Sequence, residues 1–341
     1  MFHHATICRN RSARRCRFAA CAVVLLLCTG AAGNARPGLL KDQTLAVDGS
    51  ERSYDLYIPA TGTAGSYPVV LLLHGHLGNA DVMTGENRKA APYKVWLEIA
   101  ERERLLLIIP DGERGADGYR GWNDCRADAT ILPHTDDVAF IDRLIETVAA
   151  KYPIDRTRVY ATGTSNGGDM VYRLALERAA VFAAVAPVVG AMAARSQCGM
   201  PVEPVPILIM NGSADPFQPW QGGVVGRGNK ADAIRGTVIS VADSVAFWVN
   251  HNAITAAPIS RDLPDIDTHD DSTVRVTRYT GGRDGSEVVL YAVRGGGHTE
   301  PSLSEHYSFL YRLIVGPQNG DIEMAEEVWR FFSRHHRVST P

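Results

Sequence analysis

Short apolar runs separated by amphipathic segments make up most of the chain beyond residue 40. Five of these runs lack a clean polar alternation, which is typical of strands covered on both faces: residues 69–73, 105–109, 158–162, 182–189 and 206–210. Over residues 138–148 apolar side chains recur at intervals of three and four, which predicts a helix with one buried face. Strands that alternate with helices predict an α/β fold with a mostly parallel central sheet.

The segments at either end of this pattern predict further elements. Residues 44–59 hold two strand-like runs around Asp48-Gly49, a turn signal that predicts an N-terminal antiparallel hairpin. Ser240 with Asp243 predicts the start of a helix. Residues 274–279 and 287–293 predict two more strands, and residues 322–332 a closing helix. No internal repeat divides the chain.

Residues 261–271 are rich in aspartate and are interrupted by Pro264. They predict a surface loop, and a calcium site is the alternative that such an acidic run leaves open.

The first 35 residues have the pattern of a signal peptide. Five arginines between residues 9 and 17 precede an apolar run at 18–28, and small residues follow at 31–35. The run is shorter than the roughly 20 residues that span a bilayer. Leu27 precedes Cys28 where a lipidated cysteine normally follows a small residue, which argues against a lipoprotein. We expect residues 1–35 to be a signal peptide, residues 36–341 to form a single catalytic domain, and the protein to be secreted or periplasmic.

Charge and cysteine content limit the partners and the compartment. With 35 basic and 38 acidic residues the chain has no cationic excess for a phosphate backbone, so nucleic acid is not expected as a partner. Four of the six cysteines lie within residues 1–35, which leaves Cys125 and Cys198. Two cysteines in an exported protein suggest one disulfide, with two separate thiols as the alternative.

The sequence Gly-Thr-Ser-Asn-Gly at residues 163–167 lies between the apolar run 158–162 and a helical pattern. A Gly-x-Ser-x-Gly motif in a strand-to-helix turn is typical of the nucleophile elbow of the α/β-hydrolase fold. The glycines allow the strand and helix backbones to approach closely, which exposes the serine hydroxyl. Ser165 is therefore the candidate nucleophile.

A serine nucleophile needs a histidine to accept its proton and a carboxylate to orient that histidine, in the chain order Ser, Asp or Glu, His on this fold. Of the downstream histidines, only His298 follows a strand directly through a glycine loop. Asp215 follows the run 206–210, whereas the aspartates of residues 261–271 lack such a strand. The alternative for Asp215 is that it caps a turn ahead of Pro216.

The tetrahedral oxyanion requires two backbone N–H donors, one from the residue after the nucleophile and one from the loop after an early strand. These predict Asn166 and His76. His74 in the same loop is expected to have a structural role. A metal site at His74 and His76 lacks a neighbouring cysteine or carboxylate ligand, so neither a metal nor another cofactor is expected.

Several sequence blocks together resemble the secreted polyhydroxybutyrate depolymerase and feruloyl esterase family of α/β-hydrolases. In chain order they lie at residues 73–75, 121–124, 136–138, 161–168, 214–216 and 295–299. The resemblance implies that Ser165, Asp215 and His298 form a catalytic triad and that Cys125 pairs with Cys198. It implies an ester substrate, either a hydroxyalkanoate polymer, a plant cell-wall feruloyl ester or an acetylated sugar, and does not choose among these.

Two positions depart from the family pattern. Glu300 stands where the family commonly has tryptophan, so an aromatic platform is expected to be missing. Asp169 replaces an apolar residue, either to complement the helix dipole, which we favour, or to contact substrate. Trp122 and Trp220 are candidate substrate-binding residues, with core packing as the alternative.

The predicted chemistry is a two-step acyl transfer through an acyl-enzyme. An acyltransferase or a peptidase with the same triad, and a catalytically silent polymer- or carbohydrate-binding protein, are the rival hypotheses.

Overall fold

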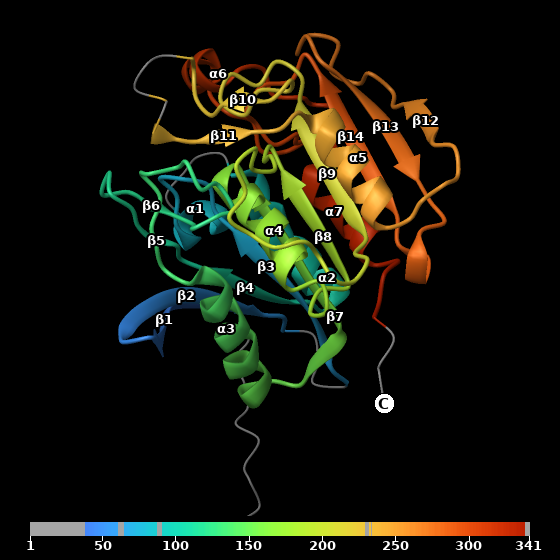
Figure 1. Cartoon of the computed structure of the whole chain (residues 1–341). Coiled ribbons are helices and arrows are strands. Elements are labelled where there is room, and N and C mark those ends of the chain that lie inside the picture. The colour runs from blue at the N-terminus through green and yellow to red at the C-terminus, as the bar shows by residue number, and fades with distance from the viewer. Residues whose placement is uncertain (1–37, 61–64, 87–90, 229–231, 233, 338–341) are drawn as a thin grey trace, which may run out of the picture. The chain divides into compact units, whose positions relative to one another are not determined.

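The computed structural model describes residues 38–60, 65–86, 91–228, 232 and 234–337. Its main feature is a ten-stranded sheet in the order β1-β2-β4-β3-β7-β8-β9-β14-β13-β12 (Figure 1). The six strands from β4 to β14 run parallel, and an antiparallel pair flanks them at each edge. This is the α/β-hydrolase architecture that the sequence predicts. The predicted signal peptide falls outside the described residues.

The predicted N-terminal hairpin is present. Strands β1 (Gly38–Val47) and β2 (Ser50–Ile58) pair antiparallel, with Val47 opposite Ser50. Asp48 and Gly49 both have positive φ angles, of 49° and 81°, as the central residues of a two-residue type I′ turn require.

The parallel strands match the five apolar runs and the later strand at 287–293, and most of their residues are buried. They are β3 (Tyr67–Leu73), β4 (Leu106–Pro110), β7 (Ile154–Thr164), β8 (Ala184–Val188), β9 (Ile207–Gly212) and β14 (Val288–Arg294). The predicted strand at 274–279 is β13 (Thr273–Tyr279). Short ribbons form from β5 (Glu113–Arg114) with β6 (Arg120–Gly121) and from β10 (Gly223–Val224) with β11 (Thr237–Val238).

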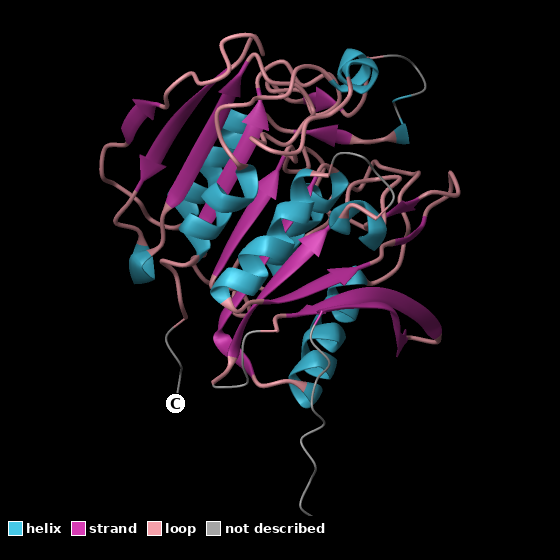
Figure 2. Ribbon diagram, turned by 180° about the vertical axis from the view of Figure 1, so that it is seen from behind, coloured by secondary structure: helices cyan, strands magenta, loops and turns pink. Residues whose placement is uncertain are grey.

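Helices cover both faces of the sheet (Figure 2). One core contains side chains of α3 (Asp137–Lys151), α4 (Asn166–Glu177) and α5 (Val241–His251). The other contains side chains of α1 (Ala80–Thr84), α2 (Val95–Glu103) and α7 (Met324–Phe332). Alternate residues of β3 enter opposite cores, Val69 and Leu71 one, Val70 and Leu72 the other, because strand side chains alternate in direction. Further helices in the described residues include α6 (Phe309–Val315) and the 3₁₀ turns η1 (Pro92–Lys94) and η3 (Arg283–Gly285).

The prediction of a loop at residues 261–271 is partly wrong. Strand β12 (Ile259–Asp262) extends into this segment and pairs with β13 at the edge of the sheet. All four of its residues are exposed, so their hydropathy pattern carries no signal of a strand.

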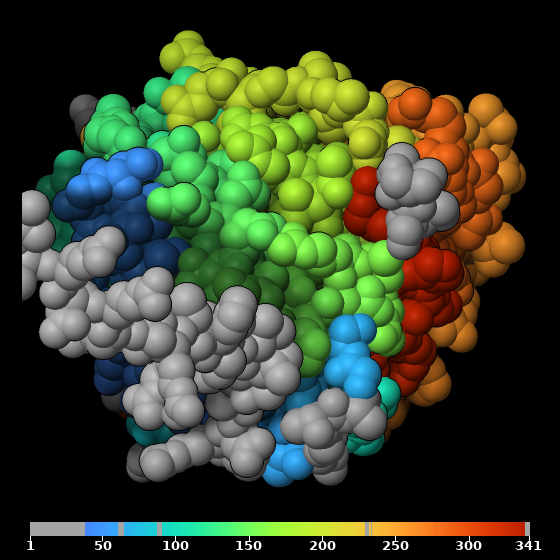
Figure 3. Space-filling model, turned by 90° about the horizontal axis from the view of Figure 1, so that it is seen from below, coloured from blue at the N-terminus to red at the C-terminus, as the bar shows by residue number. Residues whose placement is uncertain are grey.

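The last described residues lie on the face seen in Figure 3, where red C-terminal atoms border green atoms from the middle of the chain. Arg337 donates its backbone N–H to the Thr157 carbonyl at 2.9 Å and its Nη1 to the Ala179 carbonyl at 2.7 Å. These bonds attach the segment after α7 to β7 and to the α4–β8 connection.

Candidate active site

Ser165 lies in a sharp turn between β7 and α4, at the carboxyl end of the parallel strands. Its backbone has φ 55° and ψ −124°, a conformation that non-glycine residues rarely adopt. A Cβ on Gly163 would lie 2.6 Å from the Gly167 carbonyl oxygen, and one on Gly167 would lie 2.2 Å from the Leu73 carbonyl oxygen. Both positions therefore require glycine, as the elbow motif predicts.

Ser165, His298 and Asp215 come together from three separate loops. The Oγ atom of Ser165 lies 2.8 Å from Nε2 of His298, and Nδ1 of His298 lies 2.7 Å from Oδ2 of Asp215. The Asp215 carboxylate can only accept, so Nδ1 carries the proton and Nε2 is free to accept one from Ser165. The three predicted residues thus have the geometry of a nucleophile, a base and an orienting acid.

Asp215 is held by its own turn. Its other oxygen, Oδ1, accepts the backbone N–H groups of Phe217 at 2.7 Å and Gln218 at 2.8 Å. Oδ1 therefore caps the turn, as the alternative predicts, and Oδ2 faces His298, so one carboxylate can serve both purposes. The Asp215 side chain is fully buried, which fixes it beside His298.

The electrostatic environment favours a proton on His298. Burial alone would lower the pKa of His298, but the adjacent Asp215 carboxylate, assisted by Glu300 and Asp169, raises that pKa above its ordinary value. A base with a raised pKa binds the serine proton more strongly at the transition state.

The predicted oxyanion donors lie beside the nucleophile. His76 and Asn166 line the same cavity of about 300 Å³ as Ser165 and His298. Asn166 is the first residue of α4, so its backbone N–H has no acceptor within the helix. Nε2 of His76 lies 2.9 Å from Oδ2 of Asp117.

His74 has the structural role that the sequence predicts. Its Nε2 accepts the Gly112 N–H at 2.9 Å, so Nδ1 carries the proton and donates to the Gly75 carbonyl at 2.7 Å. Burial lowers the pKa of His74 to about 4, which keeps it neutral. Within the described ranges, no group of three or more His, Cys, Asp or Glu side chains is arranged to hold a metal ion.

Trp122 and Trp220, the predicted substrate-binding residues, lie in or against the core and outside the lining of the cavity that contains Ser165. Trp122 is fully buried, donates its Nε1–H to the His74 carbonyl at 2.8 Å, and does not line the cavity. Trp220 is half-buried against the core that α3, α4 and α5 share, and it does not line the cavity either. Both rings pack against the core, which is the alternative that the sequence left open.

Glu300 and Asp169, the two departures from the family pattern, are both buried and hydrogen-bonded. Glu300 lines the cavity and accepts hydrogen bonds from the hydroxyls of Thr164 and Tyr307, the latter at 2.6 Å. Asp169 does not line the cavity; it pairs with Arg126 at 3.1 Å and accepts the Ala191 N–H at 2.8 Å. Sequence reasoning missed Arg126 because nothing in its local pattern distinguishes a buried arginine from a solvated one.

A disulfide joins Cys125 to Cys198 across 73 residues of sequence. Cys125 lies between Asp124 and Arg126, both of which are buried. The bond therefore anchors the loop that carries these two charged residues.

Comparison with known proteins agrees with this architecture. The family model described as Esterase PHB depolymerase matches residues 52–216. A probable feruloyl esterase C of Aspergillus niger is 32% identical over 205 residues, which cover 58% of this chain and 68% of the relative. A putative esterase, NocK of Nocardia uniformis subsp. tsuyamanensis, is 27% identical over 289 residues, 83% of this chain and 79% of the relative.

Among solved structures, an acetyl xylan esterase from Aspergillus awamori aligns with a TM-score of 0.52 at 14% identity, covering 87% of this chain and 99% of the other. At that identity the match concerns the fold alone. The family model and the sequence relatives show that the chain belongs to the polyhydroxybutyrate depolymerase and feruloyl esterase family of α/β-hydrolases and is a carboxylic ester hydrolase.

Proposed function

We propose that the chain is a secreted serine esterase in which Ser165 is the nucleophile, His298 the base and Asp215 the orienting acid. The observation that carries the proposal is the continuous contact from Ser165 Oγ through the His298 ring to Asp215, with distances of 2.8 and 2.7 Å. The elbow conformation of Ser165 supports it, because that strained turn presents the hydroxyl to the cavity.

The first step forms the acyl-enzyme. His298 Nε2 takes the proton of Ser165 as Oγ attacks the ester carbonyl carbon. The backbone N–H groups of His76 and Asn166 donate to the resulting oxyanion, and each such donor accounts for about 10²–10³ in rate. His298 then passes its proton to the leaving alcohol oxygen as the ester bond breaks.

The second step reverses these roles. A water molecule loses a proton to His298 and attacks the acyl carbon, the same donors hold the oxyanion, and Ser165 recovers its proton when the acid leaves. Throughout, Asp215 stabilises the imidazolium form of His298. No step requires a metal or an organic cofactor.

The proposal includes export. Residues 1–35 form the signal peptide and residues 36–341 the single catalytic domain. The disulfide supports an oxidising compartment, since such bonds are rare in the cytosol. None of the helices in the described part of the chain is long and apolar enough to cross a membrane. Recovery of the protein from the culture medium or periplasm, with an N-terminus near residue 36, tests this part.

The substrates proposed are hydroxyalkanoate, feruloyl or acetyl esters. The exposed apolar side chains of α6, namely Phe309, Leu310, Leu313 and Ile314, adjoin the cavity, since Ile314 also lines it. They favour a substrate with apolar surface. Parallel assays on hydroxybutyrate film, methyl ferulate, acetylated xylan and short p-nitrophenyl esters would identify the preferred class.

Replacement of the nucleophile tests the mechanism. We expect Ser165→Ala to lower kcat on p-nitrophenyl butyrate by at least about 10⁴-fold, because removal of a nucleophile leaves only binding and the oxyanion donors. The matched control is Ser260→Ala, which removes an exposed hydroxyl on β12 and should leave kcat unchanged.

Purified Ser165→Ala protein that keeps wild-type activity would refute the proposed nucleophile. Transfer to alcohol acceptors in preference to water would favour the acyltransferase, and cleavage of peptides the peptidase. A wild-type protein that hydrolyses none of these esters would favour the binding protein.

A further inference from the structure

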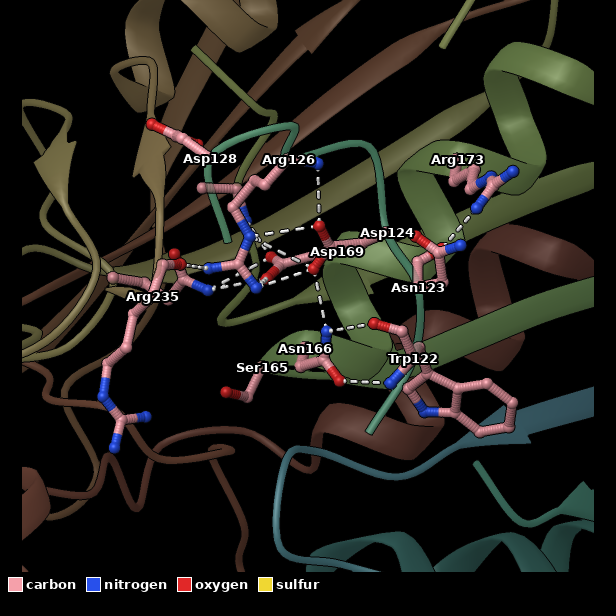
Figure 4. A network of polar contacts seen from close by, with 12 residues as sticks. Trp122, Asn123, Asp124, Arg126, Asp128, Ser165, Asn166, Asp169, Arg173 and Arg235 are labelled. Atoms are coloured by element: carbon pink, nitrogen blue, oxygen red, sulfur yellow. Dashed lines mark hydrogen bonds and ion pairs between the residues drawn. The ribbon is translucent and has the colours of Figure 1, made fainter. Parts of the chain in front are cut away.

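Arg126 lies at the centre of a buried charge network beside the proposed nucleophile, and both residues line the same cavity (Figure 4). Its side chain is only 4% exposed. It donates to both oxygens of Asp124, most closely from Nη2 at 2.6 Å, and Nη2 also lies 3.1 Å from Asp169. Nη1 donates to the backbone carbonyl of Arg235 at 2.8 Å. One guanidinium therefore bridges two carboxylates and a backbone carbonyl.

The first branch of the network leads to the proposed oxyanion hole. Oδ2 of Asp124 accepts from Nδ2 of Asn166 at 2.8 Å. The same Asn166 amide is held by the backbone of Trp122, whose N–H donates to Oδ1 at 2.7 Å and whose carbonyl accepts from Nδ2 at 3.1 Å. The side chain of Asn166 is thus fixed on both sides, and with it the residue whose N–H we assign to the oxyanion.

The second branch leads to the proposed orienting acid. Both oxygens of Asp169 accept from Nε2 of Gln218, at 2.9 and 3.1 Å. The backbone N–H of Gln218 in turn donates to Oδ1 of Asp215 at 2.8 Å. Oδ2 of Asp215 is then left for His298.

Both branches depend on the charge of Arg126. Asp124 and Asp169 are almost completely buried, and a buried carboxylate without a cation is strongly destabilised. Burial raises the pKa of Asp169 to about 7, even though Arg126 acts in the opposite direction. Loss of the guanidinium would therefore disturb both carboxylates together.

The loop that carries Arg126 is itself anchored. Cys125 is bonded to Cys198, the Cys125 carbonyl accepts the Gln197 N–H at 2.9 Å, and Nε2 of Gln197 donates to the Asp124 carbonyl at 3.1 Å. Such anchoring favours a fixed geometry of the network over a flexible one.

We propose that Arg126 is a positioning residue that holds both parts of the catalytic apparatus in register. Through Asp124 it fixes Asn166 beside the oxyanion, and through Asp169 it fixes the turn that orients Asp215. The inference rests on the proposed function, because it assumes that Asn166 and Asp215 act in the reaction.

The test compares Arg126→Met and Arg126→Lys with a matched control. Steady-state kinetics on p-nitrophenyl acetate should show kcat about 10- to 100-fold lower in Arg126→Met, with KM changed less than about threefold, because small misplacements of catalytic groups act on kcat. Arg126→Lys, which keeps the charge but lacks the planar fork, should fall between Arg126→Met and wild type.

The control is Glu287→Gln. It removes a buried carboxylate paired with Arg278 and Arg334 just before the amino end of β14, far from the carboxyl ends where Ser165 lies. It should lower the melting temperature and leave kcat unchanged. Wild-type kcat in folded Arg126→Met, or an effect confined to KM, would overturn the proposal.

If Arg126→Met does not fold, a second set of variants tests the same proposal. Asp124→Asn weakens the first branch and Gln218→Met breaks the second. Each should lower kcat about tenfold, and the two effects should combine non-additively in the double variant, because both branches end on one guanidinium. Independent, fully additive effects, or none, would overturn the proposal, whereas failure of the proposed function would appear separately as activity retained in Ser165→Ala.

Discussion

The carboxylate of Glu300 is buried in the wall of the cavity, two residues beyond His298. It accepts hydrogen bonds from Thr164, the residue before the proposed nucleophile, and from Tyr307, which follows the histidine loop in the chain. The negative charge of Glu300 is one of the influences that raise the pKa of His298. This chain thus places a negative charge close to its proposed base.

Because of this charge, we expect Glu300→Gln to change the pH dependence of the activity. His298 acts as a base only when neutral, so activity rises with pH through the His298 pKa. Removing the carboxylate lowers that pKa, so the acidic limb of log kcat/KM against pH should move to lower pH. Glu287→Gln, which also removes a buried carboxylate, should leave the limb in place. A limb that does not move, or moves to higher pH, would show that Glu300 does not act on His298.

At the residue scale, a site residue could be predicted where the sequence around it shows which element it follows. Ser165, Asp215 and His298 each follow a strand, so the sequence indicates where they meet. The partners of Trp122 and Asp169 could not be predicted because their environment is built by loops distant in sequence: Trp122 packs on His74 with ring centroids 5.0 Å apart, and Asp169 contacts Arg126 and Gln218. No spacing in the chain encodes those contacts.

At the scale of elements, buried strands and amphipathic helices were predicted closely. The helix at 138–148 is α3, and Ser240 caps α5 by accepting the Asp243 N–H at 3.0 Å. The exposed edge strand β12 was missed because its side chains face solvent and show no alternation. The short ribbon β10–β11 escaped prediction because two residues are too few to form a pattern.

The loop that holds the disulfide supports a prediction at the same scale. In Cys125→Ala/Cys198→Ala, the free energy of unfolding should fall by up to about 4 kcal/mol, because the bond closes a loop of 73 residues in the unfolded chain. Urea denaturation measures the change. Reductant should destabilise the wild type to a similar level and leave the double variant unaffected. Equal stability of the two proteins without reductant would mean that the bond does not constrain the unfolded chain.

At the scale of the whole molecule, the buried carboxyl group of Asp169 should make the stability of the fold depend on pH. The pKa of Asp169 is about 7 in the folded state, above its ordinary value of 3.8, chiefly because of burial. Between those values the folded protein binds a proton that the unfolded chain has lost, so stability falls as pH rises from about 4 to 7. One proton corresponds to a slope of up to about 1.4 kcal/mol per pH unit.

Replacement of that carboxyl group should flatten the dependence. We expect the unfolding free energy of Asp169→Asn, measured in urea at a series of pH values, to decline less steeply than that of the wild type over this window. The difference between the two curves isolates Asp169 from other groups that titrate there, such as Asp55, whose burial raises its pKa to about 6. Parallel curves would show that Asp169 does not take up this proton.

The central claim is that Ser165 is a nucleophile activated by His298. Its most direct test is labelling of the purified protein with a fluorophosphonate, followed by intact mass spectrometry and peptide mapping. We predict a single adduct on Ser165 and, in His298→Ala, labelling slower by at least about 10²-fold, since the serine then lacks its base. No adduct, or an adduct on another residue, would contradict the account.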